Sequence, residues 1–153
     1  MNKLVLDETF SKKDYSQQKL RVEYDNCTFV DCAFKEADLS TSSFLECRFI
    51  DCDFSNAQVK TSSFKEVDFE GCKMIGVNFS ECNPFMLALK FTNCNLNFAS
   101  FFKLPLKGTH FVESNLKEAD FIEAKLAETI FSSCDLAGAR FKIWLPKEKK
   151  IRA

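Results

Sequence analysis

The sequence predicts an all-β solenoid, a chain wound into stacked coils around an apolar core. Three observations favour this fold class. A large apolar residue recurs at every fifth position over most of the chain, a smaller residue lies two positions before it, and the remaining positions are mostly polar. A period of five fits neither an α-helix, which repeats about every 3.6 residues, nor a strand, which repeats every two. Short internal repeats of this kind are typical of solenoids.

The large apolar residues form two runs. The first run extends from Tyr24 to Phe79, and the second extends from Phe91 to Phe141 and alternates Phe with Leu. Fourteen of the 18 phenylalanines lie in these runs, so phenylalanine serves mainly as a repeat residue. We expect the core to contain the following members of the two runs: Phe29, Phe34, Phe44, Phe49, Phe54, Phe64, Phe69, Phe79, Phe91, Leu96, Phe101, Phe111, Leu116, Phe121, Leu126, Phe131, Leu136 and Phe141.

Each large residue is paired with the smaller one before it. One outward residue separates the two, and residues i and i+2 of an extended chain share a face, so both members of the pair point inward. The two residues that remain in each unit then turn a corner. Successive units wind into a coil with an apolar interior and a polar exterior, and each coil buries its edges by stacking on its neighbours.

All eight cysteines occupy the small inward position: Cys27, Cys32, Cys47, Cys52, Cys72, Cys82, Cys94 and Cys134. Structural zinc sites usually take two ligands about two to four residues apart, whereas the closest cysteines here are five apart, so we expect no metal site. A buried free cysteine behaves as a small hydrophobe, and core packing is the preferred interpretation. Stacked pairs such as Cys32 and Cys52 would also satisfy the Cα spacing of a disulfide. A reducing cytoplasm favours free thiols instead.

The motif resembles the pentapeptide-repeat family over residues 22–141. The resemblance rests on units such as Ala37-Asp38-Leu39-Ser40-Thr41, Cys52-Asp53-Phe54-Ser55-Asn56 and Ala119-Asp120-Phe121-Ile122-Glu123. It implies a right-handed quadrilateral β-helix with four units, about twenty residues, in each coil, and hence about six coils in this stretch. Residues twenty apart, such as Phe29 and Phe49, would then stack in columns.

The repeat is interrupted once, near residues 80–90. Phe79 and Phe91 are twelve residues apart where an unbroken register needs ten, and Pro84 stands where a large inward residue belongs. Proline lacks a backbone donor and fits poorly inside a sheet. The preferred interpretation is a kink or short loop in which Phe85 and Met86 close the gap. The alternative is a projecting loop in which Asn83, Pro84, Phe85 and Met86 contact a partner, because loops on rigid scaffolds often carry recognition.

The two ends of the chain depart from the repeat. Residues 1–21 keep Phe10, Tyr15 and Leu20 at a spacing of five, but the companion positions are polar, which predicts a degenerate coil that caps the solenoid. Residues 142–153 are basic and predict a C-terminal cap or tail, in which residues 143–145 would cover the last coil. Caps are expected because an open stack exposes apolar rungs.

The sequence offers no enzyme active site. The only histidine, His110, is outward, no glycine pattern marks a nucleophile or a phosphate-binding loop, and phenylalanine fills the interior. We therefore expect no catalytic residue and no cofactor. The N-terminus carries acids where a signal peptide is apolar, and no membrane-spanning apolar stretch is present, so the expected location is the cytoplasm.

The outer surface is the remaining candidate for function. Residues 20–141 contain 18 acids and 12 bases, a net charge of -6, although the whole chain carries only -1. The Cys- and Phe-rich units resemble the quinolone-resistance and microcin-immunity group of the family. That resemblance implies a non-enzymatic protein that binds DNA gyrase or topoisomerase IV and protects it from quinolones or peptide toxins by partial DNA mimicry. The net charge of -1 gives no case for direct nucleic-acid binding, and the lack of an 18-residue apolar run predicts no membrane association. A homodimer is compatible with the sequence. The alternative is a structural or assembly module that joins protein subunits through its coil ends.

Overall fold

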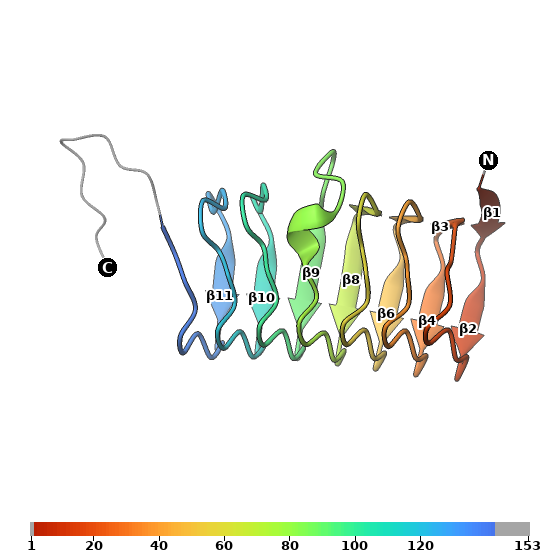
Figure 1. Cartoon of the computed structure of the whole chain (residues 1–153), viewed down its shortest axis with the longest axis horizontal. Coiled ribbons are helices and arrows are strands. Elements are labelled where there is room, and N and C mark those ends of the chain that lie inside the picture. Colours follow the sequence, from red (N-terminus) through yellow and green to blue (C-terminus); the bar gives the residue numbers. More distant parts are fainter. Residues whose placement is uncertain (1, 143–153) are drawn as a thin grey trace.

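The chain forms a rod-shaped, all-β parallel solenoid, which confirms the fold class expected from the repeat (Figure 1). The structure, a computed structural model, describes residues 2–142. Two parallel sheets run along the rod, one with the order β1-β3-β5-β7 and the other with the order β11-β10-β9-β8-β6-β4-β2. The seven strands of the longer sheet correspond to seven coils. Residues 22–142 supply the expected six, and the N-terminal segment supplies one more.

The strands are short because each side of a coil holds one five-residue unit. They are β1 (Lys3–Leu6), β2 (Thr9–Ser11), β3 (Val22–Asp25), β4 (Thr28–Val30), β5 (Ser43–Leu45), β6 (Arg48–Ile50), β7 (Ser63–Lys65), β8 (Val67–Glu70), β9 (Leu89–Thr92), β10 (His110–Val112) and β11 (Ile130–Ser132). A single 3-10 turn, η1 (Phe79–Glu81), is the only helical segment in residues 2–142. We number the coils from the N-terminus: coil 1 is 3–21, coil 2 is 22–41, coil 3 is 42–61, coil 4 is 62–81, coil 5 is 82–103, coil 6 is 104–123 and coil 7 is 124–142.

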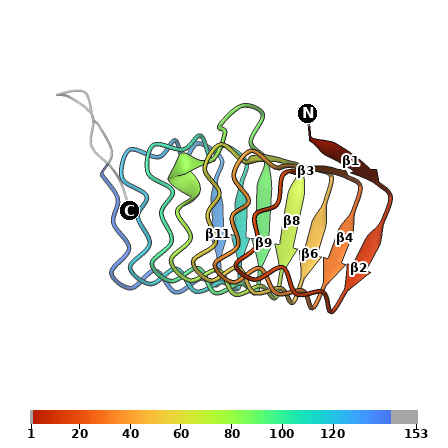
Figure 2. The same cartoon turned by 45° about the vertical axis from the view of Figure 1, so that its right-hand side comes forward.

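Residues twenty apart stack in register through the regular coils. Phe44 pairs with Phe64 in one sheet, and Phe29 pairs with Phe49 in the other. The other two sides of each coil are joined by isolated parallel bridges, so every coil has four sides (Figure 2). The inward residues therefore form four columns. Column 1 contains Val5, Tyr24, Phe44, Phe64, Leu106 and Leu126; column 2 contains Phe10, Phe29, Phe49, Phe69, Phe91, Phe111 and Phe131; column 3 contains Tyr15, Phe34, Phe54, Met74, Leu96, Leu116 and Leu136; column 4 contains Leu20, Leu39, Val59, Phe79, Phe101, Phe121 and Phe141.

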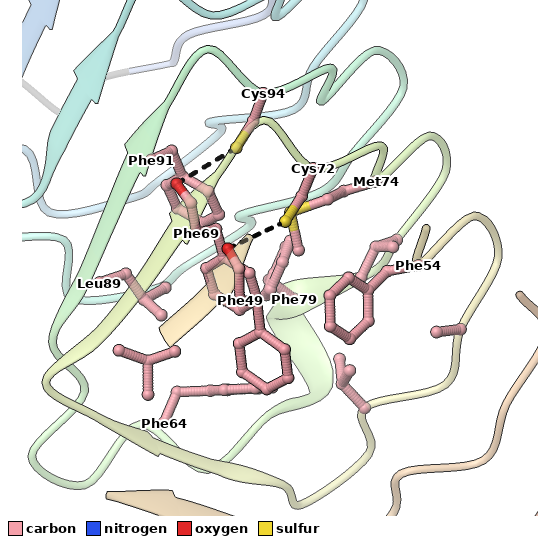
Figure 3. Close-up of a cluster of buried hydrophobic side chains, with 14 of the residues drawn as sticks. Phe49, Phe54, Phe64, Phe69, Cys72, Met74, Phe79, Leu89, Phe91 and Cys94 are labelled. Atoms are coloured by element: carbon pink, nitrogen blue, oxygen red, sulfur yellow. Dashed lines mark hydrogen bonds between the residues drawn. The ribbon is translucent and has the colours of Figure 1, made fainter. Parts of the chain in front are cut away.

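Column 2 is aromatic in every coil and forms the central stack of the core (Figure 3). Phe49 lies 4.8 Å from Phe29 and 5.1 Å from Phe69 between ring centroids, with interplanar angles of 9° and 12°. Rings of neighbouring columns meet edge to face, as Phe49 and Phe54 do at 5.0 Å and 77°. Both are favourable aromatic geometries, so each ring is packed from above, from below and from the side.

The small inward residues join successive coils through their polar atoms. The Cys72 thiol donates to the Phe49 carbonyl at 3.3 Å, and the Ser62 hydroxyl donates to the Leu39 carbonyl at 2.6 Å. Figure 3 shows the Cys72 contact. This position therefore suits a residue that is small, mostly apolar and able to donate one hydrogen bond, which explains the recurrence of Cys, Ser and Thr there.

The corners explain the polar part of the repeat. The corner residue adopts a left-handed conformation, as Glu46 does with φ 52° and Asp51 does with φ 53°. The residue before the large inward one is often Asp or Asn, because its side chain satisfies a backbone donor at the turn. Asp38 Oδ1 accepts the Ser40 backbone N–H at 3.0 Å, and hydrogen bonds from Ser40 lower the pKa of Asp38.

The two end coils differ from the interior. Phe10 pairs with Phe29 rather than with residue 30, so coil 1 is one residue short and still stacks completely on coil 2. Phe141 was expected in the core, but its side chain is 43% exposed because no described coil covers it. Leu126, Phe131 and Leu136 are half-buried for the same reason. Residues 143–145, expected to cover this end, lie outside the described residues, as does the rest of the basic segment 143–153.

Stacking in column 2 predicts a large difference between an inward and an outward substitution. Phe49→Ala removes a ring that packs against five others, and we expect it to lower the free energy of unfolding by about 3–5 kcal/mol. The exposed corner residue three positions earlier offers a control, because Glu46→Lys should change stability by less than about 0.5 kcal/mol. Chemical denaturation of both variants measures the difference. A Glu46→Lys loss as large as that of Phe49→Ala would contradict the register.

Candidate functional site

The interruption of the repeat produces a loop over residues 83–88. Asn83 still pairs with Ser63, twenty residues earlier, but Leu89 pairs with Val67, twenty-two residues earlier. Two additional residues are therefore accommodated between these positions. Stacking then resumes, because Phe91 lies 5.3 Å from Phe69 with an interplanar angle of 9°. The loop projects from the side of the rod beside η1 and β9 (Figure 1).

A short loop forms at the break, as the preferred interpretation expected, but Phe85 and Met86 lie on the surface and do not close the gap. Each side chain is 65% exposed, and neither fills the gap in column 1. Pro84 is also exposed, whereas Leu87 packs against the core. The physical reason lies in the backbone. In regular coils the N–H of the large inward residue donates to the next coil, as Leu106 donates to Lys125, and proline has no such donor.

Local hydrogen bonds fix the loop to the rod. The Phe85 backbone N–H donates to Asn83 Oδ1 at 3.0 Å, and Met86 adopts a left-handed φ of 54°. The Ala88 N–H then donates to the Phe64 carbonyl at 3.1 Å, which returns the chain to the stack. Lys65 Nζ lies 5.4 Å from the centre of the Phe85 ring, within the range of a cation–π interaction. The exposed ring is thus held in one place.

Two recesses flank the base of this loop. One has a volume of about 330 Å³ and is lined by Leu45, Met86 and Leu87 together with Glu46 and Glu66. The other has a volume of about 450 Å³ and extends from the same two glutamates to Asp68, Arg48 and Lys90. Glu46 and Glu66 occupy one corner in successive coils and form the boundary between the recesses.

Charge is distributed unevenly along the rod, with the loop near the boundary. Residues 22–81 contain 12 acids and 5 bases, a net of -7, whereas residues 82–142 contain 6 acids and 7 bases, a net of +1. The four ion pairs within the described residues lie on the surface, and three of them involve coil 6. Most carboxylates of coils 2–4 therefore face solvent without an ion-pair partner among the described residues.

The sequence analysis singled out Phe85 as an aromatic residue that could face outward, but it missed Phe98 and Phe102. They are 62% and 37% exposed, and both belong to coil 5, as does Phe85. A signal for them exists in the sequence. Of the phenylalanines outside the two runs, Phe10 belongs to coil 1, and Phe85, Phe98 and Phe102 are the others. A phenylalanine out of register in such a repeat indicates an outward ring.

The described residues show no cluster of metal ligands. They contain no group of three or more His, Cys, Asp or Glu side chains that could hold a metal ion. All eight cysteines are free, and every one except the half-buried Cys134 is buried. His110 lies half-buried on β10. Between residues 2 and 142 there is also no helix with the length and apolar character needed to cross a bilayer.

Burial of proton donors predicts a stability change at alkaline pH. Burial raises the pKa of Cys47 from 9.0 to about 11, that of Cys82 to about 12, and that of Tyr24 from 10.0 to about 12. The unfolded chain releases these protons at a lower pH than the folded chain does. The free energy of unfolding should therefore be constant below about pH 9 and should fall progressively toward about pH 12. Denaturant titrations across this range test the prediction. Cys47→Ala should flatten the decline, whereas a wild-type stability independent of pH would contradict the prediction.

Comparisons with known proteins agree with the repeat. A family model described as "Pentapeptide repeat region" matches residues 21–89, and one described as "Pentapeptide repeats (8 copies)" matches residues 106–142. No curated protein sequence matches the chain.

Several solved structures are similar to this chain. QnrB1, a plasmid-mediated fluoroquinolone resistance protein, is 21% identical with a TM-score of 0.43, over 88% of this chain and 92% of that chain. A pentapeptide repeat protein from the Arabidopsis thaliana thylakoid lumen is 27% identical with a TM-score of 0.39, over 76% and 67%. Rfr23 from the cyanobacterium Cyanothece is 15% identical with a TM-score of 0.29, over 91% of both chains. No functional conclusion follows from such low scores. The two family models, however, together match more than half of the chain and agree with its five-residue register, and the protein therefore belongs to the pentapeptide-repeat family.

Proposed function

We propose that this protein is a non-enzymatic, cytoplasmic solenoid that binds a type II topoisomerase, DNA gyrase or topoisomerase IV, and protects it from quinolones or peptide toxins by partial DNA mimicry. The observation that carries the proposal is the concentration of negative charge in coils 2–4, a net of -7 over residues 22–81. A protein surface that binds DNA is complementary to closely spaced negative charge.

The acids of coils 2–4 are arranged in rows. Glu46 and Glu66 occupy the corner before β6 and β8, and Asp31 and Asp51 occupy the corner after β4 and β6. None of the four has an ion-pair partner within residues 2–142. Successive coils lie roughly 4.8 Å apart, and phosphates along one DNA strand are spaced by about 3.4 Å of axis. Two rows of carboxylates on either side of a flat face thus offer a partial substitute for two phosphate strands.

The loop supplies apolar contact beside this charge. Phe85 and Met86 are large, exposed and fixed by local hydrogen bonds, and aromatic residues and methionine are enriched in protein interfaces. A protein that offered only acids would bind any basic surface. We propose that the loop selects the partner, while the acidic coils align it.

A supercoiling assay tests the partner directly. Purified DNA gyrase is assayed with ciprofloxacin, with and without a micromolar excess of this protein, and topoisomerase IV is assayed in parallel by decatenation. We expect the protein to restore activity that the drug has inhibited. Absence of protection for both enzymes would remove the topoisomerase proposal.

The loop and Phe98, an exposed ring elsewhere in coil 5, provide a matched pair of variants. Phe85→Ser combined with Met86→Ser should reduce protection by about tenfold or more, because the partner loses its apolar anchors. Phe98→Ser removes an equally exposed ring from the same coil and should leave protection unchanged. Both proteins should retain the wild-type unfolding curve, because all three side chains are exposed. Equal losses from the two changes would contradict the role of the loop.

A further inference from the structure

We infer that the recesses at the base of the loop bind a peptide segment of the partner in which a large apolar residue lies next to arginine or lysine. This inference deepens the proposed function, and it rests on that function only in taking the partner to be a protein. It names the chemistry that the loop selects.

The apolar half of the site is the recess between the loop and β5. Leu45, which is 39% exposed, and Met86 of the loop both line it. The volume of about 330 Å³ falls at the lower end of the range for small ligand pockets, roughly 300–1,000 Å³. It suits one aliphatic or aromatic side chain rather than a drug-sized molecule. Lys65 also lines this recess, and its Nζ lies 5.4 Å from the centre of the Phe85 ring.

The charged half of the site is the corner that the two recesses share. Glu46 and Glu66 lie at equivalent corner positions of adjacent coils, both with a left-handed backbone, at φ 52° and 57°. Like charges stacked this closely repel each other, and neither has an ion-pair partner in the described part of the chain. An incoming cation would relieve that repulsion. Arginine fits best, because its planar fork can bond two carboxylates at once.

The order of the two halves defines the segment. A chain that crosses the corner meets the apolar recess on one side and, on the other, the polar recess, which Asp68, Arg48 and Lys90 line. Its apolar side chain would therefore enter beside Met86, and its basic side chain would rest on the glutamates. A nucleic acid is disfavoured here because its phosphates would face the same carboxylates.

Selection from a random peptide library tests the inference without any topoisomerase. A phage-displayed library of random 12-residue peptides is panned on the full chain, on Glu46→Lys combined with Glu66→Lys, and on Glu113→Lys combined with Glu128→Lys. The last variant makes the same change of net charge at two exposed corners of coils 6 and 7, away from the loop. We expect peptides enriched on the wild type to pair a large apolar residue with Arg or Lys.

The enriched peptides, made synthetically, are then measured for affinity. They should bind at least about tenfold more weakly to the Glu46/Glu66 variant and to Met86→Asp, and with unchanged affinity to the control variant. No enrichment, enrichment without the basic–apolar pairing, or equal binding to all variants would overturn the inference. If the protein does not protect gyrase, the peptide selection still tests the peptide site. If the peptide selection fails, the supercoiling assay still tests the topoisomerase proposal, so the two outcomes are distinguishable.

A second inference follows from the ends of the rod. We propose that coil 1 prevents solenoids from joining head to tail. The columns alone would favour joining, because a further coil placed on coil 7 in register would match apolar residues with apolar residues. Val5, Phe10, Tyr15 and Leu20 of coil 1 would lie on Leu126, Phe131, Leu136 and Phe141. Exposed repeat ends of this kind are an aggregation hazard.

The polar positions oppose the same alignment. Every pair of charged residues that would meet has the same sign, namely Glu128 with Asp7, Asp135 with Asp14, Arg140 with Lys19 and Lys142 with Arg21. Interior junctions include like charges, as at Glu46 and Glu66, but they also include opposite charges. Lys103 pairs with Glu123 at 3.6 Å and Arg140 pairs with Asp120 at 3.7 Å, whereas the head-to-tail alignment stacks no opposite charges. Coil 1 also carries Glu8 and Lys13 at small inward positions, where a covering coil would bury their charge.

Sedimentation velocity on the full chain tests this barrier. The wild type should remain a monomer or a closed dimer at all concentrations. A variant with Asp7→Lys, Asp14→Lys, Lys19→Glu, Arg21→Glu, Glu8→Ala and Lys13→Ala should form an open-ended series that grows with concentration. Reversal of four charges in coils 2 and 3, away from the exposed face of coil 1, should leave the protein in its wild-type state of association: Glu23→Lys, Glu36→Lys, Lys35→Glu and Lys60→Glu. An open-ended series from the wild type, or a folded coil 1 variant that stays small, would overturn the proposal.

Discussion

In-register stacking of side chains between coils is the constraint on which the whole molecule depends. A five-residue unit has only two inward side chains, and neither can be covered by residues of its own unit. Phe49 is buried because Phe29 and Phe69 lie above and below it in column 2. The same alignment places Ser62 within reach of the Leu39 carbonyl. Packing and hydrogen bonding therefore demand one register, and a residue that departs from it must leave the core.

That constraint explains why the sequence predicted the regular coils well and predicted the break and the C-terminal coil less well. The spacing of five predicted the fold class and the inward residues, since only stacked coils bury such a pattern. The break was harder, because two additional residues can be absorbed either inside or outside the stack. The outcome depended on Pro84, whose missing donor excludes it from the ladder, and on Leu87, which packs inward in its place. Phe141 was misjudged because burial of a large residue requires a neighbour on both sides.

The candidate site could be located from the sequence but not described. The four residues Asn83–Met86 were identified as one option, yet nothing in their order indicated that Leu45 lies beside them, forty residues earlier. That proximity arises from two turns of the coil. The acidic corner has the same origin, since Glu46 and Glu66 are adjacent only when their coils are stacked. Surface features of a solenoid are read across coils, at intervals of about twenty residues, rather than along the chain.

The coil that contains the loop is two residues longer than its neighbours, yet the Phe69–Phe91 stack is undisturbed. Corners of this rod therefore tolerate extra length, because each coil interacts only with the coils next to it. Recognition and stability are encoded by separate residues in such a molecule. New specificities can arise by exchange of a single corner segment, with no compensating change elsewhere in the rod.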